Sequence, residues 1–211
     1  MAAPETAITG IQPAAEADFP TRWGHFRLYG FEADLGSGVE TALALRIGPL
    51  DTPLVRIHSQ CLTGDVFHSL RCDCRDQLEL ALEAIAASGN GLLIYEDKEG
   101  RGIGLINKLR AYQLQDRGAD TVEANERLGL PKDARDYRLP VEILHWFGIG
   151  RLKLLSNNPE KIQALAAAGI EVAERIACQP PAASAHAERY LRTKREKMGH
   201  LLEENSDKAR R

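Results

Sequence analysis

The stretch GLLIYEDKEGRGIGL spans residues 91–105 and joins three kinds of local sequence. Residues 91–95 form a short apolar run between polar neighbours, which is typical of a buried strand. The glycine-rich segment 99–104 predicts a turn, because glycine reaches backbone conformations that other residues avoid. Residues 105–117 are expected to form a helix. A strand, a glycine-rich turn and a helix in succession indicate α/β architecture.

The segments on either side alternate in the same way. A helix is expected between Asp73 and Gly89, because apolar residues recur there at the helical spacing i, i+3, i+4 and i+7. Further strands are expected at 23–31, 41–47, 55–57, 151–155 and 171–176, and further helices at 161–168 and from Pro140 to Phe147. Two early strands follow each other directly. We therefore expect one three-layer α/β domain, with a mixed β-sheet flanked by helices.

The length of 211 residues suits a single domain with tails. Residues 1–18 are rich in Ala, Pro and Glu without a clear period, which predicts a flexible N-terminal arm. Residues 179–211 begin with prolines and end in a charged run, which predicts a tail that is partly helical or disordered. The folded domain is expected at residues 19–178.

The bulk composition excludes several classes of partner. Hydrophobic residues make up 44% of the chain, enough for a buried core, and the net charge is −3. A weakly acidic protein has no general attraction to nucleic acid or anionic membranes, so we expect neither as a partner. The sequence has no apolar run of membrane-spanning length and no secretory pattern at its start. We therefore expect a cytoplasmic protein with reduced cysteines.

Three of the four cysteines cluster in the pattern C-x10-C-x-C: Cys61, Cys72 and Cys74. Zinc favours thiolates, and three protein ligands with one open position are typical of a catalytic zinc site. A closed structural site needs a fourth ligand, for which His58 and His68 are near enough in sequence and Cys178 is too distant. Buried cysteines without a metal are the remaining alternative.

Several long motifs follow one another along the chain. They are RIHSQCLTGD (56–65), SLRCDC (69–74), EGRGIGL (99–105), NK (107–108), RAY (110–112), DTVEAN (120–125), RDY (135–137), NNP (157–159) and KMGHLL (197–202). These motifs resemble those of the GTP cyclohydrolase II family. The resemblance implies the first step of riboflavin biosynthesis. In that step GTP is opened at its imidazole ring and gives formate, pyrophosphate and 2,5-diamino-6-hydroxy-4-(5-phosphoribosylamino)pyrimidine. It also implies a homodimer.

The resemblance assigns roles to individual residues. It implies one zinc ion per subunit on the three clustered cysteines, where the pKa of a bound water falls to about 7 and hydroxide becomes available to attack C8. It implies Mg²⁺ with the triphosphate, Arg135 as the nucleophile toward the α-phosphate, Asp133 as the proton acceptor and Tyr112 as a further catalytic residue. The implied substrate-binding residues are Arg56, Ile57, His58, Ser59, Gln60, Gln77, Glu99, Gly100, Arg101, Thr121, Ser156 and Lys161.

The residue types suit these roles, although each has a structural alternative. The carboxylate of Glu99 can accept the adjacent N–H groups of guanine, and the amide of Gln77 can serve a carbonyl. Both could equally be solvated surface residues. Asp133 and Arg135 could form an exposed ion pair of little consequence. The EGRGIG segment completes neither a phosphate-binding P-loop nor a G-x-G-x-x-G dinucleotide motif.

The sequence departs from the family pattern at a few positions. Gln60 stands where the family commonly has Glu, Arg75 where Gly is frequent and Ser156 where Thr is frequent, and the segment 96–98 is unusually acidic. None of these changes removes a proposed zinc ligand. They keep two alternatives open, namely a variant cyclohydrolase that stops at an intermediate and a non-catalytic zinc protein that binds nucleotides.

Overall fold

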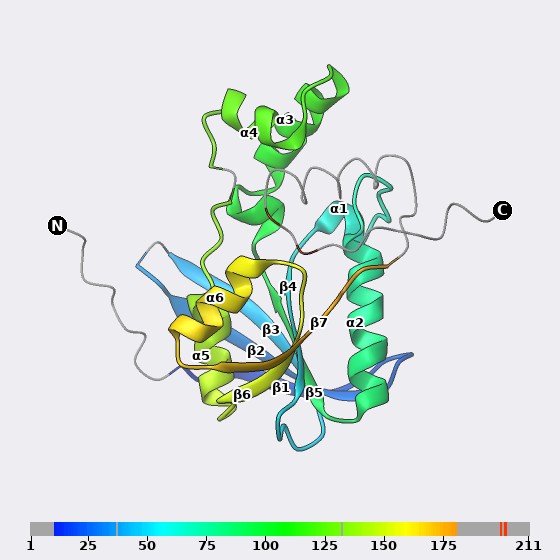
Figure 1. Cartoon of the computed structure of the whole chain (residues 1–211), viewed down its shortest axis with the longest axis vertical. Helices are drawn as coiled ribbons and strands as arrows, with labels where there is room; N and C mark the ends of the chain where they lie inside the picture. The colour runs from blue at the N-terminus through cyan, green and yellow to red at the C-terminus, as the bar shows by residue number, and fades with distance from the viewer. Residues whose placement is uncertain (1–10, 37, 132, 181–198, 200, 202–211) are drawn as a thin grey trace.

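A single mixed sheet runs through the part of the chain that the computed structural model describes, residues 11–36, 38–131, 133–180, 199 and 201 (Figure 1). The strands lie in the order β1-β2-β3-β5-β4-β6-β7. Pairing is antiparallel from β1 through β3 to β5 and parallel from β5 through β4 and β6 to β7. The strand bounds are β1 Pro13–Pro20, β2 His25–Asp34, β3 Val39–Ile47, β4 Leu54–Ser59, β5 Gly91–Glu96, β6 Arg151–Leu155 and β7 Glu171–Ile176.

Helices cover both faces of this sheet. α2 lies on one face, and α5 and α6 lie on the other, which confirms the expected three-layer α/β arrangement (Figure 1). No helix among the described residues is long and apolar enough to cross a bilayer. The helix bounds are α1 Leu62–Asp65, α2 Cys74–Ser88, the 3₁₀ helix η1 Glu99–Gly102, α3 Leu105–Asp116, α4 Thr121–Arg127, α5 Arg138–Trp146 and α6 Pro159–Ala167.

The sheet separates two hydrophobic clusters, and strand β5 contributes side chains to both. Leu92 and Ile94 point to the face covered by α5 and α6, whereas Leu93 points to the face covered by α2. Alternate residues of a strand point to opposite faces, so a strand that is apolar throughout must be covered on both. Full burial of each such side chain stabilises the folded state by about 1.5–3 kcal/mol.

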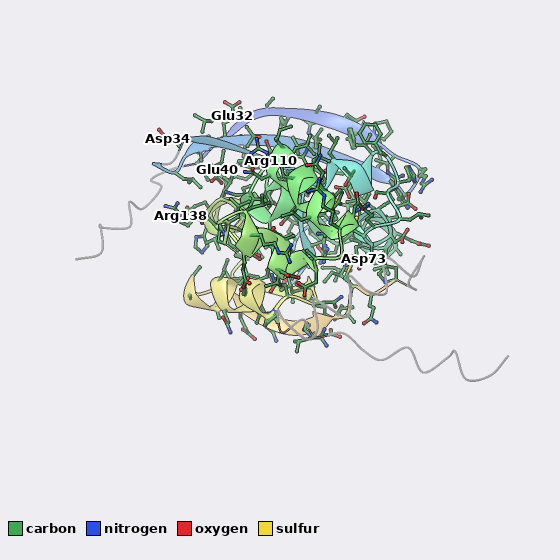
Figure 2. The ribbon with its side chains drawn as sticks, turned by 90° about the horizontal axis from the view of Figure 1, so that it is seen from above. Glu32, Asp34, Glu40, Asp73, Arg110 and Arg138 are labelled. Atoms are coloured by element: carbon green, nitrogen blue, oxygen red, sulfur yellow. The ribbon has the colours of Figure 1, made fainter. Side chains whose placement is uncertain are left out.

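The two parallel neighbours of β4 lie on opposite sides of it. From β4 the chain passes through α2 to β5 on one side, and it later reaches β6 on the other side of β4. The loops that follow parallel strands therefore separate at the carboxyl end of β4, where open α/β sheets form their ligand crevice. α3 and α4 lie at this end of the sheet, and they occupy the centre of the molecule when it is seen from above (Figures 1 and 2).

The structure corrects the expected N-terminal arm. Residues 13–18 belong to β1, which pairs antiparallel with β2. The side chains of β1 are almost all exposed, so its pairing rests on backbone hydrogen bonds and produces no apolar period in the sequence. The rest of the expected arm, residues 1–10, lies outside the described residues, as does the expected tail at 181–198 and 202–211.

Candidate active site

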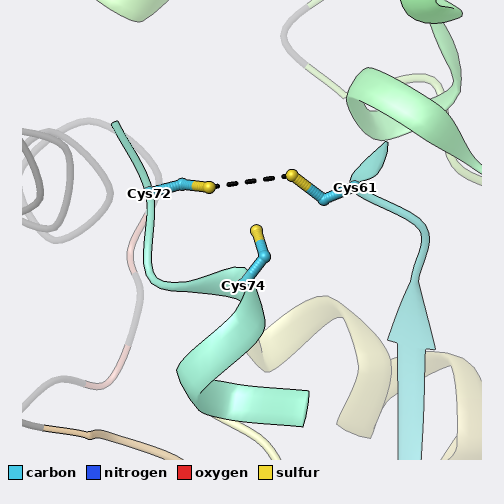
Figure 3. Close-up of side chains that lie close together, drawn as sticks. All are labelled: Cys61, Cys72 and Cys74. Atoms are coloured by element: carbon cyan, nitrogen blue, oxygen red, sulfur yellow. Dashed lines mark hydrogen bonds between the residues drawn. The ribbon is translucent and has the colours of Figure 1, made fainter. Parts of the chain in front are cut away.

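Three thiols converge where β4 ends and α2 begins (Figure 3). The sulfurs of Cys61, Cys72 and Cys74 all lie within 4.8 Å of one another, and those of Cys61 and Cys72 are 3.7 Å apart. Tetrahedral zinc with Zn–S bonds of about 2.3 Å would separate two sulfurs by about 3.8 Å. Among the described residues neither His58 nor His68 joins this group. The cluster can therefore hold a metal ion and leave a fourth position for another ligand.

Gly64 in α1 lies directly against the thiols. A Cβ at this position would lie 2.9 Å from Cys72 Sγ and 3.1 Å from Cys61 Sγ. These distances are too short for a side chain, so the turn approaches the sulfurs this closely because residue 64 is glycine. The cradle formed by Gly64 and the three thiols fits an ion that belongs inside the cluster.

Gly64→Ala is expected to weaken metal binding about 10- to 100-fold, because the new methyl group must displace the sulfurs. Competition with a chromogenic chelator measures the change in dissociation constant. Gly150→Ala is the matched control, since a Cβ at Gly150 would meet no atom within 4 Å. Equal metal affinity in the two variants would contradict a metal site at the thiols.

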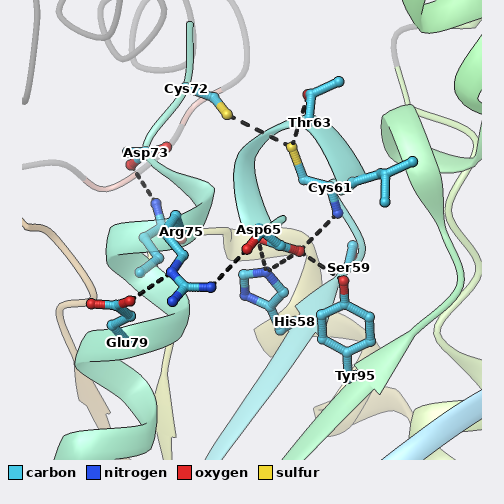
Figure 4. Close-up of polar contacts among 12 residues, drawn as sticks. His58, Ser59, Cys61, Thr63, Asp65, Cys72, Asp73, Arg75, Glu79 and Tyr95 are labelled. Carbon is cyan, nitrogen blue, oxygen red and sulfur yellow. Dashed lines mark hydrogen bonds and ion pairs between the residues drawn. The ribbon is translucent and has the colours of Figure 1, made fainter. Parts of the chain in front are cut away.

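The carboxylate of Asp65 organises the turn that carries the first cysteine (Figure 4). Only 4% of Asp65 is exposed. It accepts hydrogen bonds from Cys61 N at 3.0 Å and from the Tyr95 hydroxyl at 2.8 Å, and His58 Nε2 lies 3.3 Å from both of its oxygens. Its carbonyl accepts a hydrogen bond from Arg75 Nη1 at 2.7 Å, so Arg75 ties α2 to this turn.

The three thiols shift one another's pKa values in opposite directions. Hydrogen bonds from Cys72 and Cys74 hold the pKa of Cys61 well below its ordinary value, and the nearby ammonium of Lys108 lowers it further. The same interaction with Cys61 raises the pKa of Cys72 to about 11, and it also raises the pKa of Cys74. Binding of a metal by three thiolates would therefore release protons.

One pocket extends from the thiols to the beginning of α6. Two implied site residues do not line it: the side chain of Ile57 is in the core, and Asp133 lies beside Arg135. The implied site residues that the pocket brings together are Arg56, His58, Ser59, Gln60, Cys61, Cys72, Cys74, Gln77, Glu99, Gly100, Arg101, Tyr112, Thr121, Arg135, Ser156 and Lys161.

The far end of this pocket is cationic and buried. Lys161, in the first turn of α6, donates a 2.6 Å hydrogen bond to the carbonyl of Ile57. Burial, together with the nearby guanidinium groups of Arg56 and Arg135, lowers the pKa of Lys161. The side chain of Asn158 caps α6 by accepting from Glu160 N. An anion such as phosphate at this helix N-terminus, beside the guanidinium groups of Arg56 and Arg135, would favour the charged form of Lys161.

The Asp133–Arg135 pair is partly buried, so it is not the exposed pair of the structural alternative. The side chains are 12% and 9% exposed, respectively. Asp133 accepts hydrogen bonds from Arg135 Nε at 2.9 and 3.0 Å and also from Nη2. Arg135 Nη1 donates to the hydroxyl of Ser59 at 3.5 Å, and that hydroxyl donates to Glu96 at 2.6 Å. These contacts fix the guanidinium between two carboxylates.

Asp133→Asn is expected to reduce the acid sensitivity of folding. Burial alone would raise the pKa of Asp133, but its hydrogen bonds with Arg135 outweigh burial and lower the pKa. A carboxyl with a lowered folded-state pKa stabilises the protein above its usual pKa of about 3.9, and this contribution is lost as the pH falls through the folded value. The gap in free energy of unfolding between wild type and variant should therefore shrink below about pH 4.

Urea unfolding at a series of pH values measures this gap. The exposed residue Asp34 provides the control variant Asp34→Asn. A gap between wild type and Asp133→Asn that stays constant below about pH 4 would contradict the expected linkage.

Glu99 and Gln77 line the pocket, and hydrogen bonds fix both side chains. Glu99 is buried, and it accepts hydrogen bonds from Leu62 N and Lys108 Nζ, both at 2.7 Å. Gln77 accepts from Arg56 Nη2 at 2.6 Å. Glu99 is thus not a solvated loop residue. Gly100 N also donates to Glu99, at 2.9 Å, and a carboxylate has about four acceptor sites, so about one site is left for a ligand.

Tyr112 is part of α3, and its side chain reaches the turn that follows Cys61. Its hydroxyl is 3.4 Å from Thr63 Oγ1, and the guanidinium of Arg71 lies 4.7 Å from the centre of its ring. Burial raises the pKa of Tyr112 to about 12, so the hydroxyl remains protonated at neutral pH. Tyr112 is therefore able to donate a hydrogen bond beside the thiol cluster.

The glycine-rich turn supports the segment that carries Asp133 and Arg135. Arg101 has a left-handed backbone with φ of 63°, and its carbonyl accepts a hydrogen bond from Ala134 N at 3.0 Å. A left-handed conformation is costly for a residue other than glycine, and such strain is concentrated at functional sites. The turn places the side chain of Arg101 in the pocket while its backbone holds the neighbouring segment.

Fold and site together define an α/β enzyme, with a buried thiol cluster that opens into a cationic pocket at the carboxyl ends of parallel strands. The profile of the family described as GTP cyclohydrolase II matches residues 12–177. The chain belongs to the GTP cyclohydrolase II family, whose members are hydrolases of riboflavin biosynthesis.

Named relatives agree with this assignment. The chain is 52% identical over 193 residues to GTP cyclohydrolase-2 of Neisseria meningitidis serogroup A, covering 90% of this chain and 96% of that protein. It is 50% identical over 197 residues to GTP cyclohydrolase-2 of Shewanella sediminis, covering 92% and 95%. It is also 52% identical over 194 residues to riboflavin biosynthesis protein RibBA of Salinispora tropica, where it covers 91% of this chain but 48% of the relative.

Proposed function

We propose that this chain is a zinc-dependent enzyme that opens the imidazole ring of GTP. Its products would be formate, pyrophosphate and 2,5-diamino-6-hydroxy-4-(5-phosphoribosylamino)pyrimidine. The observation that carries the proposal is the joining of a three-thiol cluster and a buried cationic end in one pocket. Ring opening needs the first of these, and cleavage of the triphosphate needs the second.

The donor set fits zinc. Three cysteine sulfurs, with Cys61 Sγ and Cys72 Sγ 3.7 Å apart, have the softness and spacing that tetrahedral zinc prefers. When bound, zinc supplies a Lewis acid that activates water for addition to C8 of guanine. Tyr112, protonated at neutral pH, would donate a hydrogen bond to the opening ring. Glu99 and Gln77 would orient the base by accepting from and donating to its polar edge.

The triphosphate would occupy the cationic end. Arg56 and Lys161 would hold its oxygens, and Mg²⁺ would offset the remaining charge. Arg135 would attack the α-phosphate, break the bond to the β-phosphate and release pyrophosphate, after which water would cleave the nitrogen–phosphorus bond. Asp133 is hydrogen-bonded to Arg135 Nε and Nη2, so it is within reach of the proton that the guanidinium must lose.

The test is to incubate the purified protein with GTP, zinc and Mg²⁺ and to measure formate and pyrophosphate separately. Both products in equal amounts are expected. Pyrophosphate alone would replace the proposal with a variant that stops at an intermediate, and neither product would leave a non-catalytic nucleotide-binding protein.

A homodimer in the cytoplasm is proposed on the family resemblance, and light scattering coupled to gel filtration measures the oligomeric state.

A further inference from the structure

Lys108 lies between the thiol cluster and Glu99. Its ammonium donates a 3.1 Å hydrogen bond to Cys61 Sγ and a 2.7 Å hydrogen bond to Glu99 Oε1. The other oxygen of Glu99 accepts from Leu62 N, the residue after Cys61. Lys108 is 9% exposed, so this chain of contacts is removed from solvent. It connects a proposed metal ligand to a wall of the substrate pocket.

The proposed metal centre carries a negative charge that a buried cation such as Lys108 would offset. Three thiolates around a divalent ion carry one excess negative charge, and a buried charge without a partner is costly. Cys72 and Cys74 belong to the same thiolate centre, and the Thr63 hydroxyl, 3.8 Å from Cys61 Sγ, is neutral. Lys108 adds a full positive charge at 3.1 Å. Its pairing with Glu99 keeps the ammonium in place.

A hydrogen bond from a charged donor also changes how much electron density the sulfur donates to a metal. A thiolate that accepts a hydrogen bond donates less electron density to its metal, and partners of this kind tune affinity and reactivity. The metal then remains a stronger Lewis acid than three unmodified thiolates would allow. Lys108 is thus in a position to support ring opening through its contacts with Cys61 and Glu99.

We propose that Lys108 is a positioning residue, which offsets the charge of the thiolate centre and weakens electron donation from Cys61. The inference rests on the proposed zinc function and deepens it. Lys108 also fixes Glu99 relative to Cys61, so the metal centre and the base-binding wall keep one spacing. The alternative is an ion pair that contributes only to stability.

Cobalt(II)-substituted protein distinguishes these roles, because its sulfur-to-cobalt charge-transfer band responds to hydrogen bonds at the sulfur. Lys108→Met keeps the length of the chain and removes the charge. The band should move to lower energy in this variant. The zinc-loaded variant should lose about 10- to 100-fold in kcat for formate, with a smaller change in KM for GTP. Lys108→Arg should restore part of both signals.

Lys153→Met is the matched control. Lys153 lies on β6, its side chain is 48% exposed and it pairs with Glu174. This variant should keep the band and the kcat of wild type. If Lys108→Met does not fold, as judged by circular dichroism, Lys108→Gln replaces it. A neutral amide donates a weaker hydrogen bond than an ammonium, so the band should still move to lower energy.

The outcomes separate the two levels of the argument. Wild-type protein that binds no cobalt and releases no formate would sink the proposed function itself. A wild type that does both, beside a folded Lys108 variant with an unmoved band and an unchanged kcat, would overturn only the role of Lys108. A change in melting temperature without the spectral shift would assign Lys108 to stability alone.

Discussion

Cys72→Ser is expected to abolish zinc binding and formate release. The substitution removes one of three sulfurs that lie within 4.8 Å of one another, and a hydroxyl is a poor ligand for zinc at neutral pH. Since the metal supplies several kcal/mol of transition-state stabilisation, the rate of formate release should fall at least about 1,000-fold. Zinc content by mass spectrometry and formate by a coupled assay measure the two effects.

Cys178→Ser is the matched control for this prediction. Cys178 is also fully buried, but its thiol contacts the carbonyl of Gln77 at 3.6 Å and is not part of the cluster. A serine hydroxyl can donate to the same carbonyl, so zinc content and formate release should stay near those of wild type. Formate production by a zinc-free Cys72→Ser protein would refute the metal assignment.

Arg135→Met is expected to stop pyrophosphate release while zinc stays bound. The variant removes the guanidinium that Asp133 and Ser59 hold in the pocket, together with its positive charge. Loss of one group that stabilises developing charge costs about 100- to 1,000-fold in rate, and loss of a nucleophile costs at least as much. Pyrophosphate measured beside formate and zinc content separates this loss from damage to the metal site.

The chain holds a matched control for Arg135. Asp136 and Arg138 repeat the same geometry two residues apart, with backbone and side-chain hydrogen bonds from the arginine to the aspartate. This second pair is about one-third exposed, and Arg138, labelled in Figure 2, does not line the pocket. Arg138→Met should keep pyrophosphate release. Equal losses in the two variants would show that Arg135 acts on the loop and not on the triphosphate.

Those parts of the fold with a strong local pattern could be predicted from the sequence. The expected strand at 171–176 coincides with β7, and the expected helix at 105–117 ends one residue beyond α3. β1 left no such pattern, because its side chains are exposed and its hydrogen bonds come from the backbone. α1 and α4 were missed because helices of four and seven residues are too short to establish a period.

The candidate site divides in the same way. Cysteine spacing located the thiol cluster, because the ligands are close in sequence. Lys108 and Asp65 stood inside recognised motifs without a role, since their partners come from other segments. One signal was present for Lys108: it precedes Tyr112 by four residues on a helix, which puts both on one face. The contact with Cys61, 47 residues away, needed the structure.

The two ends of the pocket differ in the sequence separation of the residues that form them. Cys61 and Cys72 are eleven positions apart, whereas the hydrogen bond from Lys161 to Ile57 joins residues 104 positions apart. Contacts between distant residues form late, because a long loop must close first. During synthesis on the ribosome, all three sulfurs exist before Lys161 has been added. In the proposed function, the residues that would bind the metal are therefore synthesised before the residue that would complete the triphosphate site.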